Sequence, residues 1–200
     1  MVSLLRQSPD SVLPTPYAPM SQHTLIALLH DRPGVLHRTV TLLRRRGFNI
    51  VSLAVGRSEV PGISRMTLVV DANDATQVVQ QLDRLVEVLG VTDVTNSSAI
   101  QRETAMIKMI APPGRIATLA DDALRAGARI LELTDREIII EITDTPERVE
   151  AFIGTLRPSG IAELMRTGRL AMMRGRTPTV IETPRNFRDQ ADGAPHEEAA

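Results

Sequence analysis

The 200-residue sequence contains no cysteine and no tryptophan, and only 2% of its residues are aromatic. The lack of cysteine excludes disulfides, thiolate zinc sites, iron–sulfur clusters and cysteine nucleophiles, and it is typical of proteins in a reducing cytoplasm. The few aromatic side chains argue against RNA recognition by base stacking. We therefore expect a cytoplasmic protein.

The sequence also lacks an excess of charge and a long apolar run. Its 23 Lys and Arg residues nearly balance 24 Asp and Glu residues, for a formal net charge of −1. A balanced chain has no global field that attracts nucleic acid or an anionic membrane. No segment is long enough to span a bilayer, and the first apolar run is too short for a signal peptide. We expect a globular protein that binds neither nucleic acid nor a membrane.

Motifs for catalysis are missing as well. The sequence has no GxGxxG and no Walker loop, and no convincing pair of nucleophile and base. His30 and His37 lie seven residues apart without further residues at metal-ligand spacing, so a metal site is disfavoured. Asp121 and Asp122 are neighbours on an expected helix and face different directions. We expect neither catalytic residues nor a metal in this chain.

Two units with the same βαββαβ order follow one another. In the first unit, hydrophobic periodicity predicts strands at 24–30, 49–56, 64–70 and 91–100 and helices at 33–46 and 74–89. In the second, it predicts strands at 104–110, 129–134, 137–143 and 161–173 and helices at 114–126 and 146–156. The apolar faces of the first two helices are expected to hold Leu36, Val40 and Leu43, and then Val78, Leu82, Leu85 and Leu89.

The two units also align in sequence. RPGVLHRTVTLLRRRGFNIVSL matches PPGRIATLADDALRAGARILEL without a gap, which pairs Pro33-Gly34 with Pro113-Gly114. The predicted fold class is α+β, with two tandem ferredoxin-like sandwiches, each an antiparallel sheet with two helices on one face. Units of about 75 residues are small for a single core, which favours a homodimer or a larger assembly.

The expected domain organisation follows from this repeat. It comprises a flexible Pro- and Ser-rich tail at 1–22, a first domain at 23–100, a second domain at 101–175 and a flexible tail at 176–200.

The stretch HDRPGVLHRTV contains a helix start with an unusual composition. Pro33 is expected as the first helical residue, because its missing N–H costs nothing there. The following amides of Gly34, Val35 and Leu36 would then point out of the helix, where they attract a carboxylate or a phosphate. Alternatively, Asp31 caps these amides itself.

Longer motifs allow a family to be named. HTLIALLHDRPGVLHRTVTLLRRRGFNIVSLAVG followed by SRMTLVV closely resembles the ACT domain of the small regulatory subunit of acetolactate synthase. The similarity continues through QLDRLVEVLGVTDVT, the pair Arg102-Glu103, LRPSGIAELMRTG and LAMMRG. It covers residues 23–175 and implies an ACT domain at 23–100 and an ACT-like domain at 101–175.

The resemblance implies a non-catalytic regulatory role in branched-chain amino-acid biosynthesis. Subunits of this family pair through their ACT domains, activate a separate large catalytic subunit and confer feedback inhibition by an end product, usually valine. The thiamine diphosphate, Mg²⁺ and FAD of the holoenzyme are then expected on the catalytic partner. The second domain is expected to contribute to contact with that partner.

The resemblance also implies a ligand site. Its residues are Asp31, Gly34, Val35 and Leu36 of one copy with Asn49 and Ile50 of a second copy. The valine carboxylate would lie on the helix-start amides, its ammonium group near Asp31 and Asn49, and its isopropyl group against Leu36 and Ile50. The second unit has Ala128-Arg129 in place of Phe48-Asn49, which puts an equivalent site there in doubt.

Three alternatives remain. The first is an ACT-type sensor that regulates a different enzyme or binds a different amino acid. The second is a ligand-responsive nucleic-acid regulator, which the lack of a helix-turn-helix segment and the near-zero net charge disfavour. The third is an independent enzyme, which would need a catalytic group that the sequence does not offer.

Overall fold

The computed structural model describes residues 21–175. The tails assigned to 1–22 and 176–200 lie outside the described residues, except for Ser21 and Gln22, which begin the first strand. The elements of the first domain are β1 (Ser21–His30), α1 (Val35–Arg45), β2 (Asn49–Arg57), β3 (Ile63–Ala72), α2 (Ala75–Leu82) and β4 (Val88–Asp93). Those of the second are β5 (Ala99–Ile110), α3 (Pro113–Arg125), β6 (Arg129–Leu133), β7 (Glu137–Asp144), α4 (Pro146–Leu156), a short 3₁₀ helix (Arg157–Ser159), β8 (Ile161–Arg166) and β9 (Leu170–Met173).

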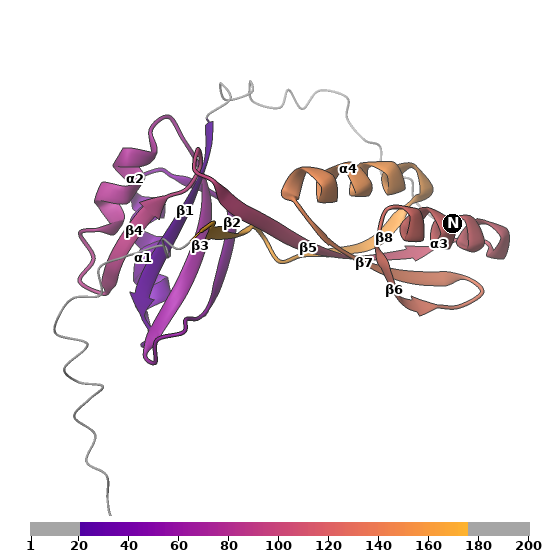
Figure 1. Cartoon of the computed structure of the whole chain (residues 1–200), viewed down its shortest axis with the longest axis horizontal. Coiled ribbons are helices and arrows are strands. Elements are labelled where there is room, and N and C mark those ends of the chain that lie inside the picture. Colours follow the sequence, from indigo (N-terminus) through magenta and orange to yellow (C-terminus); the bar gives the residue numbers. More distant parts are fainter. Residues whose placement is uncertain (1–20, 176–200) are drawn as a thin grey trace, which may run out of the picture.

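Each domain is an antiparallel sheet with two helices on one face (Figure 1). The strand order is β2-β3-β1-β4 in the first sheet and β6-β7-β5-β8 in the second. Between sheet and helices lie separate apolar cores, one containing Leu25, Leu43 and Leu68, the other Ile107, Ile140 and Phe152. The two predicted ferredoxin-like sandwiches are therefore confirmed.

The buried face of α1 differs from the predicted one. Val35, Thr39 and Leu43 are buried, whereas Val40 is half-buried and Leu36 is 41% exposed. A threonine can be buried here because its hydroxyl donates to the carbonyl oxygen of Val35, 3.0 Å away. Of the predicted Leu36/Val40/Leu43 face, Leu43 is confirmed as buried, Val40 is only half-buried and Leu36 was wrong, because it remains open to solvent.

The second helix is shorter than predicted. α2 ends at Leu82, so Leu85 lies in a turn and Leu89 in β4. β4 pairs with β1, and this ladder prevails over the helical spacing of the leucines. The strand predicted at 91–100 is correspondingly divided: β4 begins at Val88, and Ala99 and Ile100 belong to β5.

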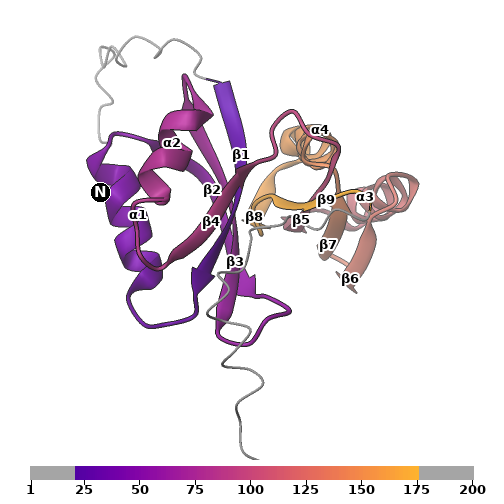
Figure 2. The same ribbon diagram turned by 60° about the vertical axis from the view of Figure 1, so that its left-hand side comes forward.

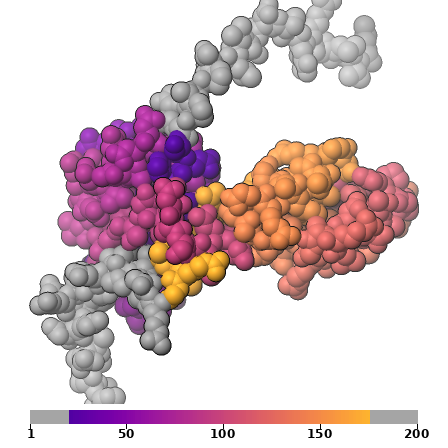
Figure 3. Space-filling model, turned by 45° about the horizontal axis from the view of Figure 1, so that its top comes forward, coloured from indigo at the N-terminus to yellow at the C-terminus, as the bar shows by residue number. Residues whose placement is uncertain are grey.

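β5 connects the two domains. Residues 99–102 pair with β9, whereas residues from Glu103 onward pair with β7. The single strand predicted at 161–173 is two strands, because the chain turns at Gly168 with φ of 78°. Ala171 of β9 packs on Ile26, on the face of the first sheet that carries no helices. The chain of the second domain thus returns to the first (Figures 2 and 3).

Candidate functional site

The loop between β1 and α1 contains a tight turn. The amide of Val35 donates to the carbonyl oxygen of Arg32 at 3.3 Å, and Gly34 has φ of 82° and ψ of −10°. Proline at the second position and glycine with positive φ at the third are the signature of a type II turn. Pro33 therefore precedes the helix, and the prediction that it is the first helical residue was wrong. The turn also satisfies the Val35 amide, one of the three amides expected to be unpaired.

The start of α1 is left open in a different way from the one predicted. No side chain in the described part of the chain caps it, and the Asp31 carboxylate instead lies 3.6 Å from Nε of Arg57. The amides of Gly34, Leu36 and His37 belong to the first turn, whose N–H groups have no partner within a helix. His37 is not among the predicted site residues, because the predicted helix began two residues too early.

Arg38 is a second residue that the sequence did not reveal. A Cβ atom built on Gly34 would lie only 3.1 Å from Nη1 of Arg38. The guanidinium also forms an ion pair with Glu87, with 2.6 Å between Nη2 and Oε1. The spacing of four residues, one helical turn, was the available signal. A cation thus lies beside the backbone amides at the start of α1.

Asn49 and Ile50 lie at the other end of the first domain. Nδ2 of Asn49 donates to Oδ2 of Asp71 at 2.7 Å, and Ile50 is half-buried against the core. Asn49 begins β2, whereas Arg57, the ion-pair partner of Asp31, ends it. Eight residues of strand span about 26 Å, so within one chain these two parts of the predicted site are not brought together.

β2 is an edge strand of the first sheet. Its outer side pairs with no other strand of the described chain, and Val51 and Val55 are exposed along it. An edge of this kind presents unpaired backbone groups that can accept a strand of another molecule. The two halves of the predicted site lie at opposite ends of this edge.

The second domain lacks the open turn. α3 begins directly at Pro113, and Gly114 lies inside the helix. The amides of Arg115 and Ile116 both donate to the carbonyl oxygen of Pro112. Arg129, which aligns with Asn49, forms an ion pair with Glu141 at 3.4 Å.

Residues 21–175 offer neither a metal site nor a membrane-spanning helix. Within this range no group of three or more His, Asp or Glu side chains is arranged to hold a metal ion. No helix in the same range is long and apolar enough to cross a membrane.

Comparison with known proteins relates both domains to one group. Residues 25–90 match the AHAS small subunit-like ACT domain, and residues 102–175 match the small subunit of acetolactate synthase. A probable acetolactate synthase small subunit of Archaeoglobus fulgidus is 43% identical, over 77% of this chain and 98% of the relative. The acetolactate synthase small subunit of Mycolicibacterium smegmatis is 37% identical, over 76% of this chain and 91% of the relative.

A solved structure gives the same result for the fold. The crystal structure of the acetolactate synthase small subunit from Thermotoga maritima superposes with a TM-score of 0.72 and 35% sequence identity. The match covers 79% of this chain and 100% of that one.

Proposed function

Because this chain belongs to the family of acetolactate synthase small subunits, we propose that it activates a separate catalytic subunit and makes it sensitive to feedback inhibition. The proposed effector is valine or another branched-chain amino acid. The main support is the start of α1, which combines free amides, an adjacent cation and an exposed leucine.

The chemistry of this turn fits the carboxylate of an amino acid. The amides of Gly34 and Leu36 and the guanidinium of Arg38 would face the negative charge. Glycine suits this position, because other residues rarely adopt its φ of 82° and a Cβ there would lie 3.1 Å from Nη1 of Arg38. The apolar part of the ligand would then meet Leu36, which the fold leaves exposed.

A second copy would complete the site. Two chains paired antiparallel along the β2 edge would bring Asn49 and Ile50 of one copy toward the α1 start of the other. Nδ2 of Asn49 is engaged by Asp71, so the side-chain oxygen is the group that would accept the ligand's ammonium, together with Asp31. A buried methylene contributes about 0.8 kcal/mol, so the pocket would separate valine, leucine and isoleucine weakly from one another and strongly from glycine.

Catalysis would belong to the partner. Thiamine diphosphate, Mg²⁺ and FAD would be bound by the large catalytic subunit, and this chain would supply no reacting group. The second domain offers a docking face for that subunit. Met106 and Met165 are exposed neighbours on β5 and β8, and they lie on the sheet face opposite the helices.

The test is a tagged pull-down of the full chain from its native extract, followed by assay of acetolactate formation with and without valine. We expect a thiamine-dependent partner whose activity rises when this chain is added and falls with valine. A partner of another kind, or a response to serine or an aromatic amino acid, would favour a sensor for a different enzyme. Acetolactate formation unchanged by this chain would overturn the proposal.

A further inference from the structure

Glu103 occupies the point where β5 passes from one domain to the other. Arg102, the residue before it, still pairs with Leu170 of β9, whereas Glu103 pairs with Asp144 of β7. Its side chain is only 7% exposed. A carboxylate so buried must be compensated by a cation and by hydrogen bonds, because its desolvation is costly.

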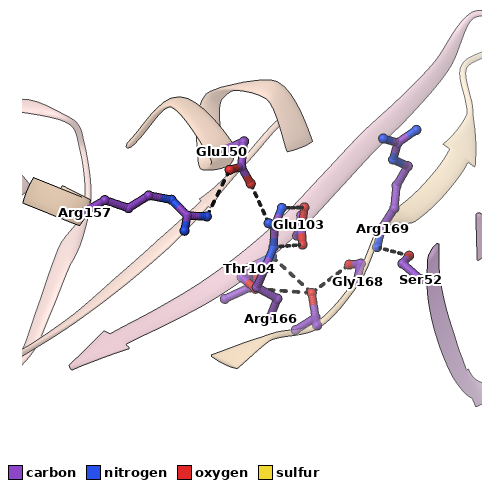
Figure 4. A network of polar contacts seen from close by, with 9 residues as sticks. Ser52, Glu103, Thr104, Glu150, Arg157, Arg166, Gly168 and Arg169 are labelled. Atoms are coloured by element: carbon purple, nitrogen blue, oxygen red, sulfur yellow. Dashed lines mark hydrogen bonds and ion pairs between the residues drawn. The ribbon is translucent and has the colours of Figure 1, made fainter. Parts of the chain in front are cut away.

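Arg166 supplies both. Its Nε and Nη2 donate to the two carboxylate oxygens of Glu103 at 2.6 and 2.9 Å, and Nη1 donates to Glu150 of α4 at 2.6 Å (Figure 4). The hydrogen bonds with Glu103 raise the pKa of Arg166 above its ordinary value, and the hydrogen bond from Arg166 lowers the pKa of Glu150. One planar guanidinium thus joins the interdomain strand to a helix of the second domain.

The linker between β8 and β9, residues 167–169, is fixed to the first sheet. The backbone amide of Arg169 donates to Oγ of Ser52 at 3.1 Å, and its Nη1 donates to Oγ1 of Thr24 at 2.9 Å. Gly168 lies so close to β2 that an added Cβ would be 3.0 Å from Oγ of Ser52. Ser52 is two residues from Ile50 on the same strand. Arg166 therefore lies three residues along the chain from Arg169, whose amide contacts β2. This strand carries Asn49 and Ile50, half of the proposed effector site.

The two domains are not packed against each other along their whole length. A cleft of about 760 Å³ lies between them, lined by residues of both domains that include Val51, Glu147 and Arg166. Within the described chain the connection depends on β5, on residues 167–169, on the polar contacts around them and on the packing of Ala171 of β9 against Ile26.

We propose that Arg166 is a positioning residue that fixes the angle between the two domains and so transmits effector binding from the first domain to the second. The transmission rests on the proposed function, whereas the fixed angle does not. Lysine at this position would keep the charge and lose the two-pronged geometry, so the Arg166→Lys substitution separates these contributions.

The experiment measures the interdomain distance by double electron–electron resonance on the full chain. Because the sequence has no cysteine, Val86→Cys and Leu124→Cys provide unique label positions in the two domains; these side chains are 91% and 60% exposed. Dilution with unlabelled chain isolates the distance within one molecule. We expect one narrow distribution in the otherwise native chain, and broadening in Arg166→Lys and in the milder Glu150→Gln.

The matched control is Arg148→Lys, which alters an ion pair at 3.1 Å between α4 and Asp144 of β7 and touches neither β5 nor residues 167–169. It should leave the distance distribution unchanged. A distribution in folded Arg166→Lys and Glu150→Gln as narrow as in the parent chain would overturn the fixed joint.

Transmission is tested by adding valine. In the parent chain we expect valine to shift the interdomain distance and to inhibit the holoenzyme. Arg166→Lys should bind valine with parental affinity and lose both effects. If this variant is inhibited as the parent is, transmission through Arg166 is wrong. If the parent chain itself does not bind valine, the proposed function fails, and the distances without effector still decide whether Arg166 fixes the joint.

Discussion

The first helices of the two domains begin with the same dipeptide and yet have different starts. Pro33-Gly34 forms a type II turn before α1, whereas Pro113-Gly114 forms the first residues of α3. The helices end at aligned residues, Arg45 and Arg125, so the difference lies only at the beginning.

The two starts also present different faces. Leu36 is exposed, whereas Ile116, which aligns with it, is buried. In the second domain Pro112 precedes Pro113 and is confined to an extended conformation, with φ of −58° and ψ of 153°, which suits the residue before a helix. In the first domain a positive φ at Gly34 delays the helix and turns its first residues. The same motif thus closes one helix start and leaves the other open.

Gly34→Asp should have the largest effect on the open start of α1 and so on valine binding. A carboxylate at the open turn would repel the carboxylate of the effector and crowd Arg38. A loss of about 3 kcal/mol of binding would raise the valine concentration for half-inhibition by about 100-fold, while activation should persist. Acetolactate formation by the reconstituted holoenzyme measures both.

The matched control is Gly114→Asp, at a helical position with no neighbour within 4 Å of an added Cβ. Its valine response should equal that of the native chain. Equal responses of both variants would remove the α1 start from the proposed site.

Core substitutions test the packing difference between the helices. Leu43 and Ala123 align and both are fully buried. Leu43→Ala should destabilise the first domain by about 3 kcal/mol through the cavity it leaves. Ala123→Leu should destabilise the second by about 2 kcal/mol through overpacking. Urea unfolding measures both, and a neutral Ala123→Leu would show that the second core is loosely packed.

Asn49 and Arg129 are aligned and are the first residues of β2 and β6. Substituting each of them compares the roles of these two strand starts in valine inhibition. Asn49→Ala should weaken valine inhibition by about tenfold, because one hydrogen bond to a charged group is worth about 1.5 kcal/mol. Arg129→Ala should remove an ion pair with Glu141 and leave inhibition unchanged. Dose–response curves of valine inhibition for the two variants test this difference. A larger effect of Arg129→Ala would place an effector site in the second domain.

The smallest expected effect concerns the second helices. Asp74 caps α2 by accepting the amide of Thr76, and this hydrogen bond lowers the pKa of Asp74 below its ordinary value of 3.8. The cap is therefore complete above that pH and is lost as the pH falls through the lower folded-state pKa. Thr145, which caps α4, does not titrate.

Amide shifts of Thr76 and Arg148 in an acid titration followed by NMR should show this difference. The Thr76 amide should follow the carboxylate, and Arg148 should not. Asp74→Asn retains the capping oxygen and should abolish the Thr76 titration. A Thr76 shift that persists in this variant would assign the titration to another group.

The sequence was sufficient for the fold and insufficient for the helix starts. Alternating strands and the internal repeat predicted two ferredoxin-like units, because burial of one sheet face imposes that pattern. The predicted α1 face of Leu36, Val40 and Leu43 has the spacing that α3 in fact uses, with Ile116, Ala120 and Ala123. In α1 the positive φ of Gly34 changes which residues face the core. The periodicity of apolar residues carries no information on that angle.

Long-range contacts explain what else was missed. The leucines at 85 and 89 continue a helical spacing, yet β4 forms there because β1 offers a partner strand. Arg38 approaches Gly34 across one helical turn, and Arg166 meets Glu103 across 63 residues. The first had a spacing signal, whereas the second depends on two strands lying side by side, which no local pattern encodes.

Titration calorimetry of valine into the full chain measures effector binding, the first step of the proposed regulation. We predict a single class of sites, with a stoichiometry of one valine per chain, weakened about 100-fold by Gly34→Asp and unchanged in Gly114→Asp. Binding of parental affinity in Gly34→Asp, or weakened binding in Gly114→Asp, would contradict an effector site at the start of α1.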